Sequence, residues 1–335
     1  MVNAISIVTG GAGFIGSHLT ELLLSQGHQV RVIDNLVGGH KSNLDHLLKN
    51  QALKCFWEDI NQLEPDSDIF KGADFCFHLA GIGDIVPSIE QPIDYMKTNV
   101  QGTVNVLEAA RMAELRKFVY AASSSCYGLA DTPTDENHRI DPQYPYALSK
   151  YLGEQAVFHW GKVYGLPCNS ICIFNAYGTR VRTTGAYGAV FGVFLKQQLA
   201  GEPFTIVGDG HQKRDFIYAS DVARSFLAAA EVPTCGERYN IGAGNPQSIN
   251  YLVGLLGKND IVYIPKRPGE PEVTYANISK AEKELDWQPL VSFEDGVSRM
   301  VNDIDRWKNA PLWDPNSIAK ATETWFKYLG PNLDK

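Results

Sequence analysis

Tyr146 and Lys150 lie four residues apart in the segment YPYALSK, residues 144–150. On a helix, this spacing places both side chains on one face. A phenol titrates at a pKa of about 10, and a neighbouring ammonium group favours the phenolate and lowers that pKa. The pair is therefore a candidate general base, unless Tyr146 only packs and Lys150 is only solvated. Tyr144 has Leu148 at the same spacing and is expected to face elsewhere on the helix, which makes it the weaker base.

Three consecutive serines, Ser123, Ser124 and Ser125, follow the apolar run 117–122. They are either the polar end of a strand or the source of a hydroxyl that acts in a reaction. A hydroxyl at a strand end close to a tyrosine–lysine pair can hydrogen-bond a substrate oxygen. Residue type alone does not separate these two interpretations.

Gly10, Gly13 and Gly16 follow one another at three-residue intervals in VTGGAGFIGSHL. In a dinucleotide-binding turn, the first glycine permits the tight turn, the second lets the backbone approach a pyrophosphate, and the third lets helix and strand pack closely. The helix that follows presents N–H donors and the positive end of its dipole to the phosphates. An ordinary glycine-rich turn is the alternative, and it would not require an acid in the next strand.

Asp34 supplies that acid at the end of the apolar run 29–34. A carboxylate there accepts hydrogen bonds from the ribose hydroxyls and repels a 2′-phosphate, which favours NAD over NADP. Asp59 follows the third apolar run and either hydrogen-bonds the adenine amino group or is an ordinary turn acid. The first half of the chain therefore has the pattern of an NAD site.

Short apolar runs alternate with amphipathic stretches in this half of the chain. Several runs lack polar alternation, which is typical of parallel strands covered on both faces. The alternation predicts an α/β fold, a Rossmann-type doubly wound parallel sheet with right-handed crossovers. The predicted strands are 4–9, 29–34, 53–57, 74–80, 117–122 and 168–174, and the predicted helices are 16–27, 95–113 and 146–165.

The pattern becomes less regular after about residue 175, where Gly, Pro and Thr are frequent. We expect residues 1–175 to form the NAD-binding domain, to which some later segments return. Residues 176–335 are expected to form mainly a smaller substrate-binding lobe and C-terminal helices. Within this lobe, 187–201 is predicted to be helical, and 214–231 is predicted to be a short strand followed by a helix.

The tail carries Trp313, Trp325, Phe326 and Tyr328 at roughly helical spacing. This pattern indicates a terminal helix that docks on the protein or, alternatively, one that binds a partner.

Composition excludes several classes of function. The chain of 335 residues has a net charge of −8 and no run of Lys or Arg, which argues against nucleic acid or a membrane as the main partner. Its six cysteines form no CxxC pair and its eight histidines no HExxH pattern, so neither a disulfide framework nor a metal site is expected. No signal-peptide pattern appears, and a cytoplasmic location is expected.

Nine segments together resemble the nucleotide-sugar epimerase/dehydratase branch of the extended short-chain dehydrogenase/reductase family. They span about residues 7–290 and read TGGAGFIGSHL, DNL, HLAG, NVQGTVNVLEAAR, ASSSCYG, YALSK, FNAYG, GDGHQKRDFIY and RPGEPEVTYANISKAEKELDW. The resemblance implies an NAD-dependent enzyme of carbohydrate biosynthesis that acts on a nucleotide-diphosphate sugar. It is specific for the family and much less specific for one substrate.

By this resemblance, Ser123 is the catalytic hydroxyl, because it lies four residues before Tyr127 in the family's Ser/Thr-x-x-x-Tyr-Gly stretch. Ser123 would hydrogen-bond the sugar oxygen and Tyr146 would transfer its proton. Lys150 would bind the nicotinamide ribose and tune Tyr146. The implied cofactor-binding residues are Gly10, Gly13, Phe14, Ile15, Gly16, Asp34, Asn35, Asp59, Ile60, Leu79, Ala80, Gly81, Asn99, Tyr146 and Lys150.

The resemblance also implies a set of substrate residues on the later half of the chain. Arg214 and Arg267 would clamp the diphosphate, because guanidinium groups bind phosphate oxygens in a bidentate manner. Thr274 would border the sugar C2 substituent, and its modest volume would admit an N-acetyl group. The nucleotide is most often UDP in similar enzymes. The implied substrate-binding residues are Ser124, Ser125, Asn175, Arg214, Arg267 and Thr274.

Several reactions of this family begin with hydride transfer from the sugar C4 to NAD⁺. A 4,6-dehydratase also needs an acid and a base, which the family supplies as an Asp-Glu pair directly after the catalytic hydroxyl. Ser124 and Ser125 occupy those positions here, and their hydroxyls titrate too high to replace carboxylates. A net reductase commonly prefers NADP, which Asp34 disfavours. We therefore expect a 4-epimerase of the UDP-glucose, UDP-N-acetylglucosamine or UDP-glucuronate type, with dehydratase, 4-keto reductase, decarboxylase and non-enzymatic dinucleotide-binding protein as the alternatives.

Helices 95–113 and 146–165 form the paired face of the dimer in similar enzymes. Their apolar residues exceed what one face of a sheet needs, which predicts a homodimer. These residues are Val100, Val104, Leu107, Tyr151, Val157 and Trp160.

Overall fold

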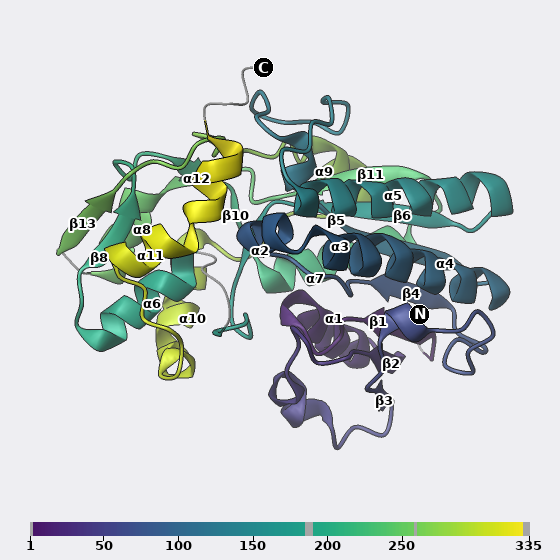
Figure 1. Ribbon diagram of the computed structural model, residues 1–335. Helices are drawn as coiled ribbons and strands as arrows, with labels where there is room; N and C mark the ends of the chain where they lie inside the picture. The colour runs from purple at the N-terminus through teal and green to yellow at the C-terminus, as the bar shows by residue number, and fades with distance from the viewer. Residues whose placement is uncertain (1–2, 185–189, 258–259, 331–335) are drawn as a thin grey trace.

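The computed structural model describes residues 3–184, 190–257 and 260–330. Its centre is a parallel sheet of seven strands, which are labelled in Figure 1. In their order across the sheet, the strands are β11 (Glu237–Ile241), β6 (Cys168–Ile173), β5 (Lys117–Ser123), β4 (Phe75–His78), β1 (Ile5–Thr9), β2 (Gln29–Ile33) and β3 (Leu53–Phe56).

The burial of these strands explains why their sequences lack polar alternation. Every residue of β4 is buried, and β5 is buried along its length until Ser123. Parallel strands with helices on both faces require apolar side chains on both faces. The six strands and the doubly wound parallel sheet predicted from the sequence are confirmed. The direction of the strand order reverses between β1 and β4, and ligands of such sheets bind outside the carboxyl ends at this point.

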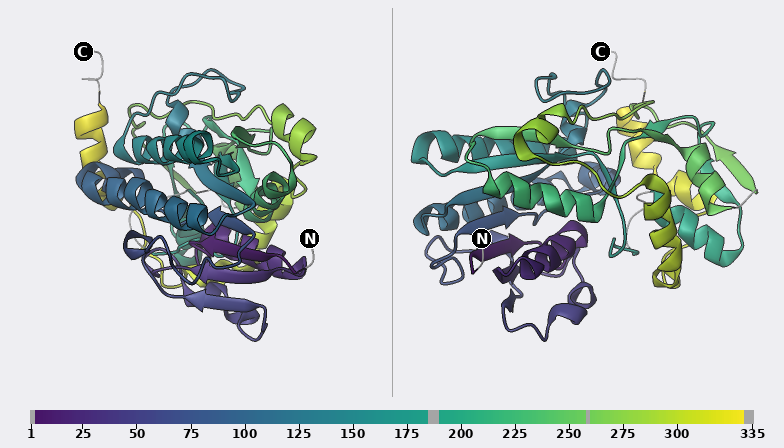
Figure 2. Two further views of the ribbon diagram at one scale, coloured as in Figure 1. Left: turned by 90° about the vertical axis from the view of Figure 1, so that its right-hand side faces the viewer. Right: turned by 180° about the vertical axis from the view of Figure 1, so that it is seen from behind.

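Helices cover both faces of the sheet (Figure 2). One face packs against α1 (Phe14–Ser25) and α7 (Ala219–Glu231), which contribute Leu19, Leu23 and Phe226 to its core. The other face packs against a long helical segment and α5 (Pro145–Tyr164). This segment changes from α3 (Pro92–Met96) through a π-helical turn, η4 (Lys97–Gln101), to α4 (Gly102–Met112).

Two residues expected at a subunit interface lie elsewhere. Leu107 of α4 and Val157 of α5 are fully buried in the core beneath the sheet. Their apolar character is therefore explained by packing within the chain. Other apolar residues of the two helices are exposed, among them Met112, Val163 and Tyr164.

A second, smaller lobe has its own apolar core, which is rich in aromatic side chains. Its parallel pair, β8 (Phe204–Val207) and β13 (Ile261–Ile264), packs against α6 (Val190–Ala200), and α8 (Ile249–Leu256) and α10 (Phe293–Asn302) complete the core. The predicted helix 187–201 thus corresponds to α6, and residues 187–189 lie outside the described residues. Two further two-stranded ladders are described: β7 (Asn175–Tyr177) pairs with β10 (Phe216–Tyr218), and β9 (Lys213–Arg214) pairs with β12 (Gln247–Ser248).

Segments after residue 175 also belong to the sheet lobe. β11 pairs with β6 at the sheet edge, α7 packs on one face, and α9 (Ser279–Leu285) contacts β11. Further short helices among the described residues are η1 (Lys41–Asn43), η2 (Asp45–Leu47), η3 (Ile60–Gln62), α2 (Ile85–Glu90), η5 (Ser124–Tyr127) and η6 (Ile304–Trp307).

The tail forms two short helices, α11 (Pro315–Ala321) and α12 (Glu323–Leu329), where the sequence suggested one docked helix. Trp313 precedes α11, Trp325 is buried, and Phe326 and Tyr328 are 41% and 57% exposed. α12 contacts α2 of the sheet lobe, and Figures 1 and 2 show it in yellow at the junction of the two lobes. Among the described residues, no helix is long and apolar enough to cross a membrane.

Candidate active site

The glycine turn after β1 is closed by backbone contacts that leave no room for side chains. Gly10 has a φ of +70°, and a Cβ atom there would lie 2.7 Å from the backbone nitrogen of Ala80. A Cβ atom on Gly16 would lie 2.1 Å from the carbonyl oxygen of Gly10. Gly13 caps α1, and Phe14 and Ile15 form its first turn. The turn therefore presents backbone N–H groups and the N-terminal end of α1, as a phosphate site requires.

Asp34 follows β2 and lies beside this turn. The residue is 6% exposed, and its carboxylate accepts hydrogen bonds from the backbone nitrogens of Ala12 at 3.0 Å and Leu36 at 2.8 Å. Burial raises the pKa of Asp34, and these two hydrogen bonds oppose the rise. The next side chain, Asn35, accepts a hydrogen bond from Val37. The glycine turn and the acid predicted from the sequence thus lie together at the carboxyl ends of β1 and β2.

Asp59 has a local role in this structure. Its Oδ1 accepts hydrogen bonds from the backbone and side-chain nitrogens of Asn61, both at 2.9 Å, and so caps η3. The neighbouring Ile60 is buried. This geometry is that of a turn acid, one of the two interpretations that the sequence left open.

The segment after β4 closes the other side of the turn. Leu79 is partly buried against the core, and the nitrogen of Ala80 donates to Thr9 Oγ1 at 3.2 Å. The Asn99 side chain is 1% exposed and accepts from the Ile82 nitrogen at 2.9 Å while donating to the Ile82 oxygen at 3.0 Å. Asn99 therefore holds the loop that follows Gly81.

Asn99 also links this loop to the helix that carries the tyrosine–lysine pair. Its Nδ2 donates to Ser149 Oγ at 2.9 Å. A Cβ atom on Gly81 would lie 2.9 Å from Asn99 Oδ1 and 3.7 Å from Lys150 Nζ. Asn99 and Gly81, predicted on the cofactor side, thus lie within a few ångströms of the helix that carries Tyr146 and Lys150.

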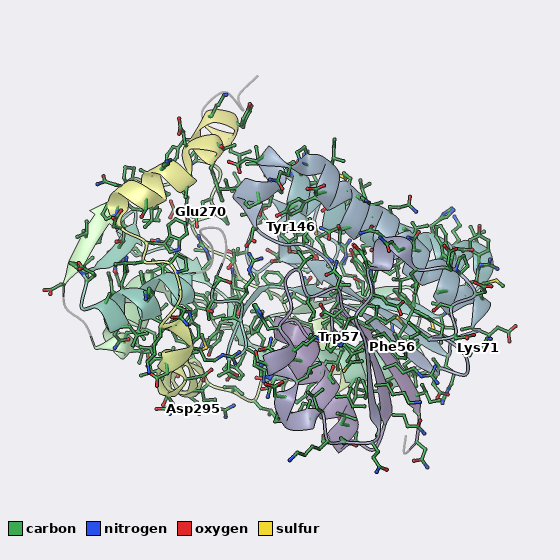
Figure 3. All side chains as sticks on the ribbon, turned by 60° about the horizontal axis from the view of Figure 1, so that its bottom comes forward. Phe56, Trp57, Lys71, Tyr146, Glu270 and Asp295 are labelled. Carbon is green, nitrogen blue, oxygen red and sulfur yellow. The ribbon has the colours of Figure 1, made fainter. Side chains whose placement is uncertain are left out.

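Tyr146 lies in the first turn of α5, and Lys150 lies one turn later. Lys150 is 7% exposed, and its ammonium group lies 4.4 Å from the centre of the Tyr120 ring. Burial lowers the pKa of Lys150 to about 8, and Glu154 opposes this shift. Figure 3 labels Tyr146 on the sheet lobe and Glu270 on the smaller lobe, each on the side of its lobe that borders the other.

The tyrosine titrates differently from the expectation stated above. Burial raises the pKa of Tyr146 above its ordinary value, and a hydrogen bond with Ser123 opposes the rise. The sequence pattern pointed only to the neighbouring Lys150, whereas in the protein the loss of water around the phenol has the largest influence on its pKa. The prediction that the pKa of Tyr146 is lowered is therefore wrong for the protein without ligands.

The serine triplet begins at the carboxyl end of β5. Ser123 is the last residue of that strand, and its Oγ lies 2.8 Å from Ser125 Oγ. It also accepts a hydrogen bond from the Ser125 nitrogen at 3.3 Å, which caps η5. Ser124 follows in the first turn of η5 and is half-buried. A hydrogen bond from Ser123 also acts on the pKa of Tyr146, which places the two side chains close together.

Tyr144 does not face away from Tyr146. It precedes α5 in an extended conformation, with φ −151° and ψ 162°, so the angular spacing of a helix does not apply to it. Its ring stacks on the Tyr146 ring with centroids 6.4 Å apart and planes 10° apart. The expectation that it faces elsewhere was wrong because the helix begins one residue after it.

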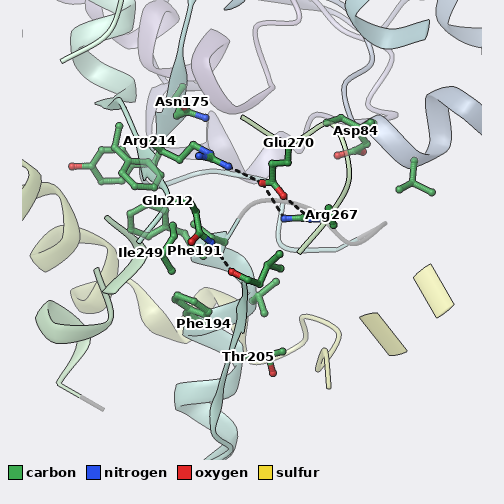
Figure 4. Close-up of a pocket in the computed structure, with 18 of the residues that line it drawn as sticks. Asp84, Asn175, Phe191, Phe194, Thr205, Gln212, Arg214, Ile249, Arg267 and Glu270 are labelled. Atoms are coloured by element: carbon green, nitrogen blue, oxygen red, sulfur yellow. Dashed lines mark hydrogen bonds and ion pairs between the residues drawn. The ribbon is translucent and has the colours of Figure 1, made fainter. Parts of the chain in front are cut away.

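Two arginines of the smaller lobe share one carboxylate (Figure 4). Arg214 Nη2 donates to Glu270 Oε1 at 2.8 Å, and Arg267 Nε donates to Glu270 Oε2 at 2.8 Å. All three residues line a cavity of about 340 Å³ that also reaches α2 and the aromatic core of the lobe. The structure therefore brings together the two arginines that the sequence placed at a diphosphate.

Asn175 and Thr274 form a second polar pair beside the arginines. Thr274 Oγ1 donates to Asn175 Oδ1 at 2.6 Å and accepts from the Asp215 nitrogen at 3.1 Å. Asn175 lines the same cavity as Arg214 and Arg267. These contacts fix the orientation of the Asn175 amide at the cavity wall.

Glu270, Asp84 and Trp325 are among the side chains of this cavity that sequence reasoning missed. Glu270 stands three residues after Arg267 in RPGE, so its spacing to the arginine was a usable signal. Asp84 has a φ of +79° and forms an ion pair with Arg182 at 2.5 Å. Trp325 comes from α12, and no local pattern indicates which element it meets.

The residues of the sheet lobe fit a bound dinucleotide. The glycine turn forms a cradle that Cβ atoms on Gly10 or Gly16 would fill. Asp34 is buried beside this turn after β2, and the buried Lys150 lies close to Gly81, which follows β4. These are the donor and acceptor types that pyrophosphate and ribose groups require.

Comparison with known proteins places this geometry in one family. The NAD-dependent epimerase/dehydratase family model matches residues 6–242. A relative described as a putative UDP-glucose 4-epimerase, from Methanocaldococcus jannaschii, is 36% identical over 304 residues, which cover 88% of this chain and 97% of the relative.

Two solved structures are similar along almost the whole chain. UDP-N-acetylglucosamine 4-epimerase from Methanobrevibacter ruminantium, in complex with UDP-N-acetylmuramic acid, matches with a TM-score of 0.85 and 30% identity over 92% of this chain and 98% of its own. UDP-glucuronic acid 4-epimerase from Bacillus cereus, in complex with UDP-glucuronic acid and NAD, matches with a TM-score of 0.84 and 32% identity over 90% of this chain and 99% of its own. The resemblance stated from the sequence motifs is confirmed. The chain belongs to the NAD-dependent epimerase/dehydratase family.

Proposed function

We propose that the protein inverts the configuration at C4 of a UDP-linked sugar, with NAD as a cofactor that it keeps bound. The observation that carries this proposal is the arrangement of Ser123, Tyr146 and Lys150 at the sheet, with two arginines around the neighbouring cavity. A relative and two structural neighbours that act on UDP-sugars support it.

The proposed reaction returns every atom and electron to the sugar. NAD⁺ supplies the acceptor for the C4 hydride and gives the hydride back to the opposite face of the sugar. Tyr146 takes the proton of the C4 hydroxyl in the first half and returns it in the second. Between the two halves the 4-keto sugar rotates, so that its other face meets the cofactor.

Each catalytic side chain has a defined task. Ser123 hydrogen-bonds the C4 oxygen and orients Tyr146 through the hydrogen bond between them. Lys150 holds a positive charge close to the phenol and binds a ribose hydroxyl. Burial lowers the pKa of Lys150 and so disfavours its charged form. A ribose hydroxyl that accepts a hydrogen bond from the ammonium group would stabilise the charged form.

Epimerisation is preferred over dehydration because of the residues beside Ser123. Loss of water from C6 needs an acid and a base next to the sugar. Ser124 and Ser125 provide only hydroxyls, and Ser125 Oγ is already hydrogen-bonded to Ser123 Oγ. We propose that both serines hydrogen-bond the sugar.

The diphosphate of the substrate is proposed to lie between Arg214 and Arg267. The Glu270 carboxylate accepts hydrogen bonds from both guanidinium groups, which supports the idea that this pair can hold an anion. Asn175 is proposed to bind the diphosphate or the ribose, and Thr274 to border the C2 substituent and to leave room for an N-acetyl group.

The division at residue 175 is proposed to separate cofactor binding from substrate binding, with β11, α7 and α9 returning to the first part. We also propose a homodimer in the cytoplasm. Exposed apolar side chains on α4 and α5, such as Met112, Val163 and Tyr164, support the dimer. Six free cysteines support a reducing compartment.

The function is tested by the cofactor and the product together. The purified protein is denatured and the released dinucleotide is identified, and native protein is incubated with UDP-glucose, UDP-N-acetylglucosamine and UDP-glucuronate. We expect NAD and a C4-inverted sugar from at least one substrate. A 4-keto-6-deoxy sugar, or net formation of NADH, would contradict the proposal.

A further inference from the structure

The helix α12 joins the two lobes and contributes Trp325 to the wall of the cavity. Its Trp325 and Leu329 form a separate apolar cluster with Val86 of α2, and Tyr144 packs against the same cluster. A hydrogen bond of 2.8 Å from Thr324 Oγ1 to Glu90 Oε1 adds a polar contact between α12 and α2. The helix therefore packs on the sheet lobe although it follows the smaller lobe in the chain.

Trp325 makes a second set of contacts, with the arginine segment of the smaller lobe. The Arg267 guanidinium lies 5.2 Å from the centre of the Trp325 ring, within the range of a cation–π interaction. Trp325 Nε1 donates to the Pro268 carbonyl oxygen at 2.8 Å. The indole thus fixes both the backbone and the side chain of the segment that carries Arg267.

Arg267 is held from two directions by these contacts. Glu270 accepts its hydrogen bonds, and Trp325 covers its guanidinium group. Trp325 also lines the cavity that contains Arg214 and Arg267, although only 5% of the residue is exposed. A ligand that displaced Glu270 from Arg267 would leave the indole contact in place.

The same indole reaches the aromatic rings beside the catalytic tyrosine. Trp325 and Tyr144 have ring centroids 6.3 Å apart, and Tyr144 stacks on Tyr146. One side chain therefore touches the arginine of one lobe and the neighbour of the catalytic tyrosine in the other. The family model matches residues 6–242, so Trp325 and Arg267 both lie outside the matched region.

We propose that Trp325 is a substrate-positioning residue, which holds Arg267 in the orientation that binds the diphosphate of the substrate. The inference rests on the proposed function only for the diphosphate, and not for epimerisation. Trp325 acts through Arg267 and takes no part in proton or hydride transfer.

The test measures diphosphate affinity separately from catalysis. Protein that contains its cofactor is titrated calorimetrically with UDP, dTDP, GDP, ADP and CDP, and the tightest ligand is then measured with the variants. Trp325→Ala is expected to raise its Kd roughly tenfold, the loss expected for a desolvated cation–π contact. Trp325→Phe keeps an aromatic ring over Arg267 and loses the hydrogen bond to Pro268, so we expect a smaller rise.

Two matched variants separate positioning from packing. Leu329→Ala removes a buried side chain of the same cluster without touching Arg267, and Tyr328→Ala removes an exposed aromatic ring of the same helix. Both are expected to leave the Kd within about twofold of the wild-type value, with Leu329→Ala lowering the melting temperature. In turnover, Trp325→Ala should raise KM by the same factor as Kd and leave kcat within about threefold.

The possible results decide between the two roles. A selective rise for Trp325→Ala, partly restored by Trp325→Phe, supports the proposal even if the turnover product is not a C4 epimer. An equal rise for Leu329→Ala and Trp325→Ala, or none for either, overturns it. A wild-type protein that binds none of the five diphosphates overturns both this inference and the diphosphate assignment on which it rests.

Discussion

The two sides of the site carry their positive charge in different surroundings. On the sheet lobe, Lys150 is 7% exposed, its ammonium group lies over the Tyr120 ring, and burial lowers its pKa to about 8. On the smaller lobe, Arg214 and Arg267 are both hydrogen-bonded to the Glu270 carboxylate at 2.8 Å. One cation is isolated from water, and the other two are paired within the lobe.

This difference separates groups that react from groups that bind. A buried titratable group whose pKa is shifted towards working pH can exchange or stabilise a proton. A paired guanidinium stays charged at all relevant pH values and offers hydrogen bonds in a fixed plane. We therefore expect changes on the sheet lobe to alter kcat and pH dependence, and changes on the smaller lobe to alter KM.

The largest expected effect is on the sheet lobe. Tyr146→Phe removes the hydroxyl that exchanges the proton but keeps the ring that stacks on Tyr144. We expect kcat to fall roughly 10²–10⁴-fold, the contribution of a positioned general acid–base group, with bound NAD retained. Steady-state turnover and the cofactor content of the variant check this. Turnover equal to that of the wild type would end the catalytic assignment.

A second prediction uses the pH dependence of stability to isolate Lys150. Its pKa is about 8 in the folded protein and 10.5 in its ordinary state. Between these values the unfolded chain binds more protons than the folded protein. The contribution of Lys150 to stability therefore grows as pH rises from 8 towards 10.5, and it is lost as pH falls through 8.

Lys150→Met has no such titration and serves as the reference. We expect the wild type to gain roughly 2 kcal/mol over this variant between about pH 7.5 and about pH 9.5, measured by urea unfolding at equal cofactor content. A constant difference between the two proteins across this range would mean that Lys150 is not desolvated as the structure indicates.

On the smaller lobe, Arg214→Ala is expected to change binding more than chemistry. Loss of charge-assisted hydrogen bonds to the diphosphate should raise KM roughly tenfold while kcat changes little. Arg214→Lys should recover part of the loss, because an ammonium keeps the charge and not the bidentate geometry. Arg139→Ala is the control, since the Arg139 side chain is 81% exposed. A fall in kcat with unchanged KM for Arg214→Ala would contradict the proposal that the sheet lobe carries the chemistry and the smaller lobe binds the substrate.

The smallest expected effect concerns the serine triplet. Ser125→Ala removes the hydroxyl that lies 2.8 Å from Ser123 Oγ, a contact worth about 1 kcal/mol. We expect kcat to fall only about two- to tenfold, far less than for Tyr146→Phe. Parallel kinetics of Ser123→Ala and Ser125→Ala check the ranking. A greater loss of kcat for Ser125→Ala than for Ser123→Ala would assign the catalytic hydroxyl to Ser125 instead of Ser123.

The parts of the site that the sequence predicted depend on local backbone geometry. Gly10 has a positive φ, a Cβ atom on Gly16 would meet the backbone of the turn, and Asp34 directly follows the neighbouring strand β2. Tyr146 and Lys150 follow from the spacing of one helix. Such relations are carried by residues close in sequence, so a motif is sufficient to place them.

The parts of the site that the sequence did not predict depend on contacts between distant segments of the chain. Trp325 meets Tyr144 and Arg267 because α12 packs across both lobes, and no periodicity in the tail indicates those partners. Tyr144 was placed wrongly because the exact start of α5 decides where its ring lies. The raised pKa of Tyr146 likewise depends on burial by the whole surroundings of the phenol.

The central claim, that NAD removes and returns the same hydride at C4, is tested most directly with an isotope. A UDP-sugar that carries deuterium at C4 is incubated with the protein, and the product is analysed by NMR and mass spectrometry. The account predicts a C4-inverted sugar that keeps its deuterium at C4, with no net NADH. Loss of the deuterium to solvent or to free NAD, or a product that has lost water, would contradict it.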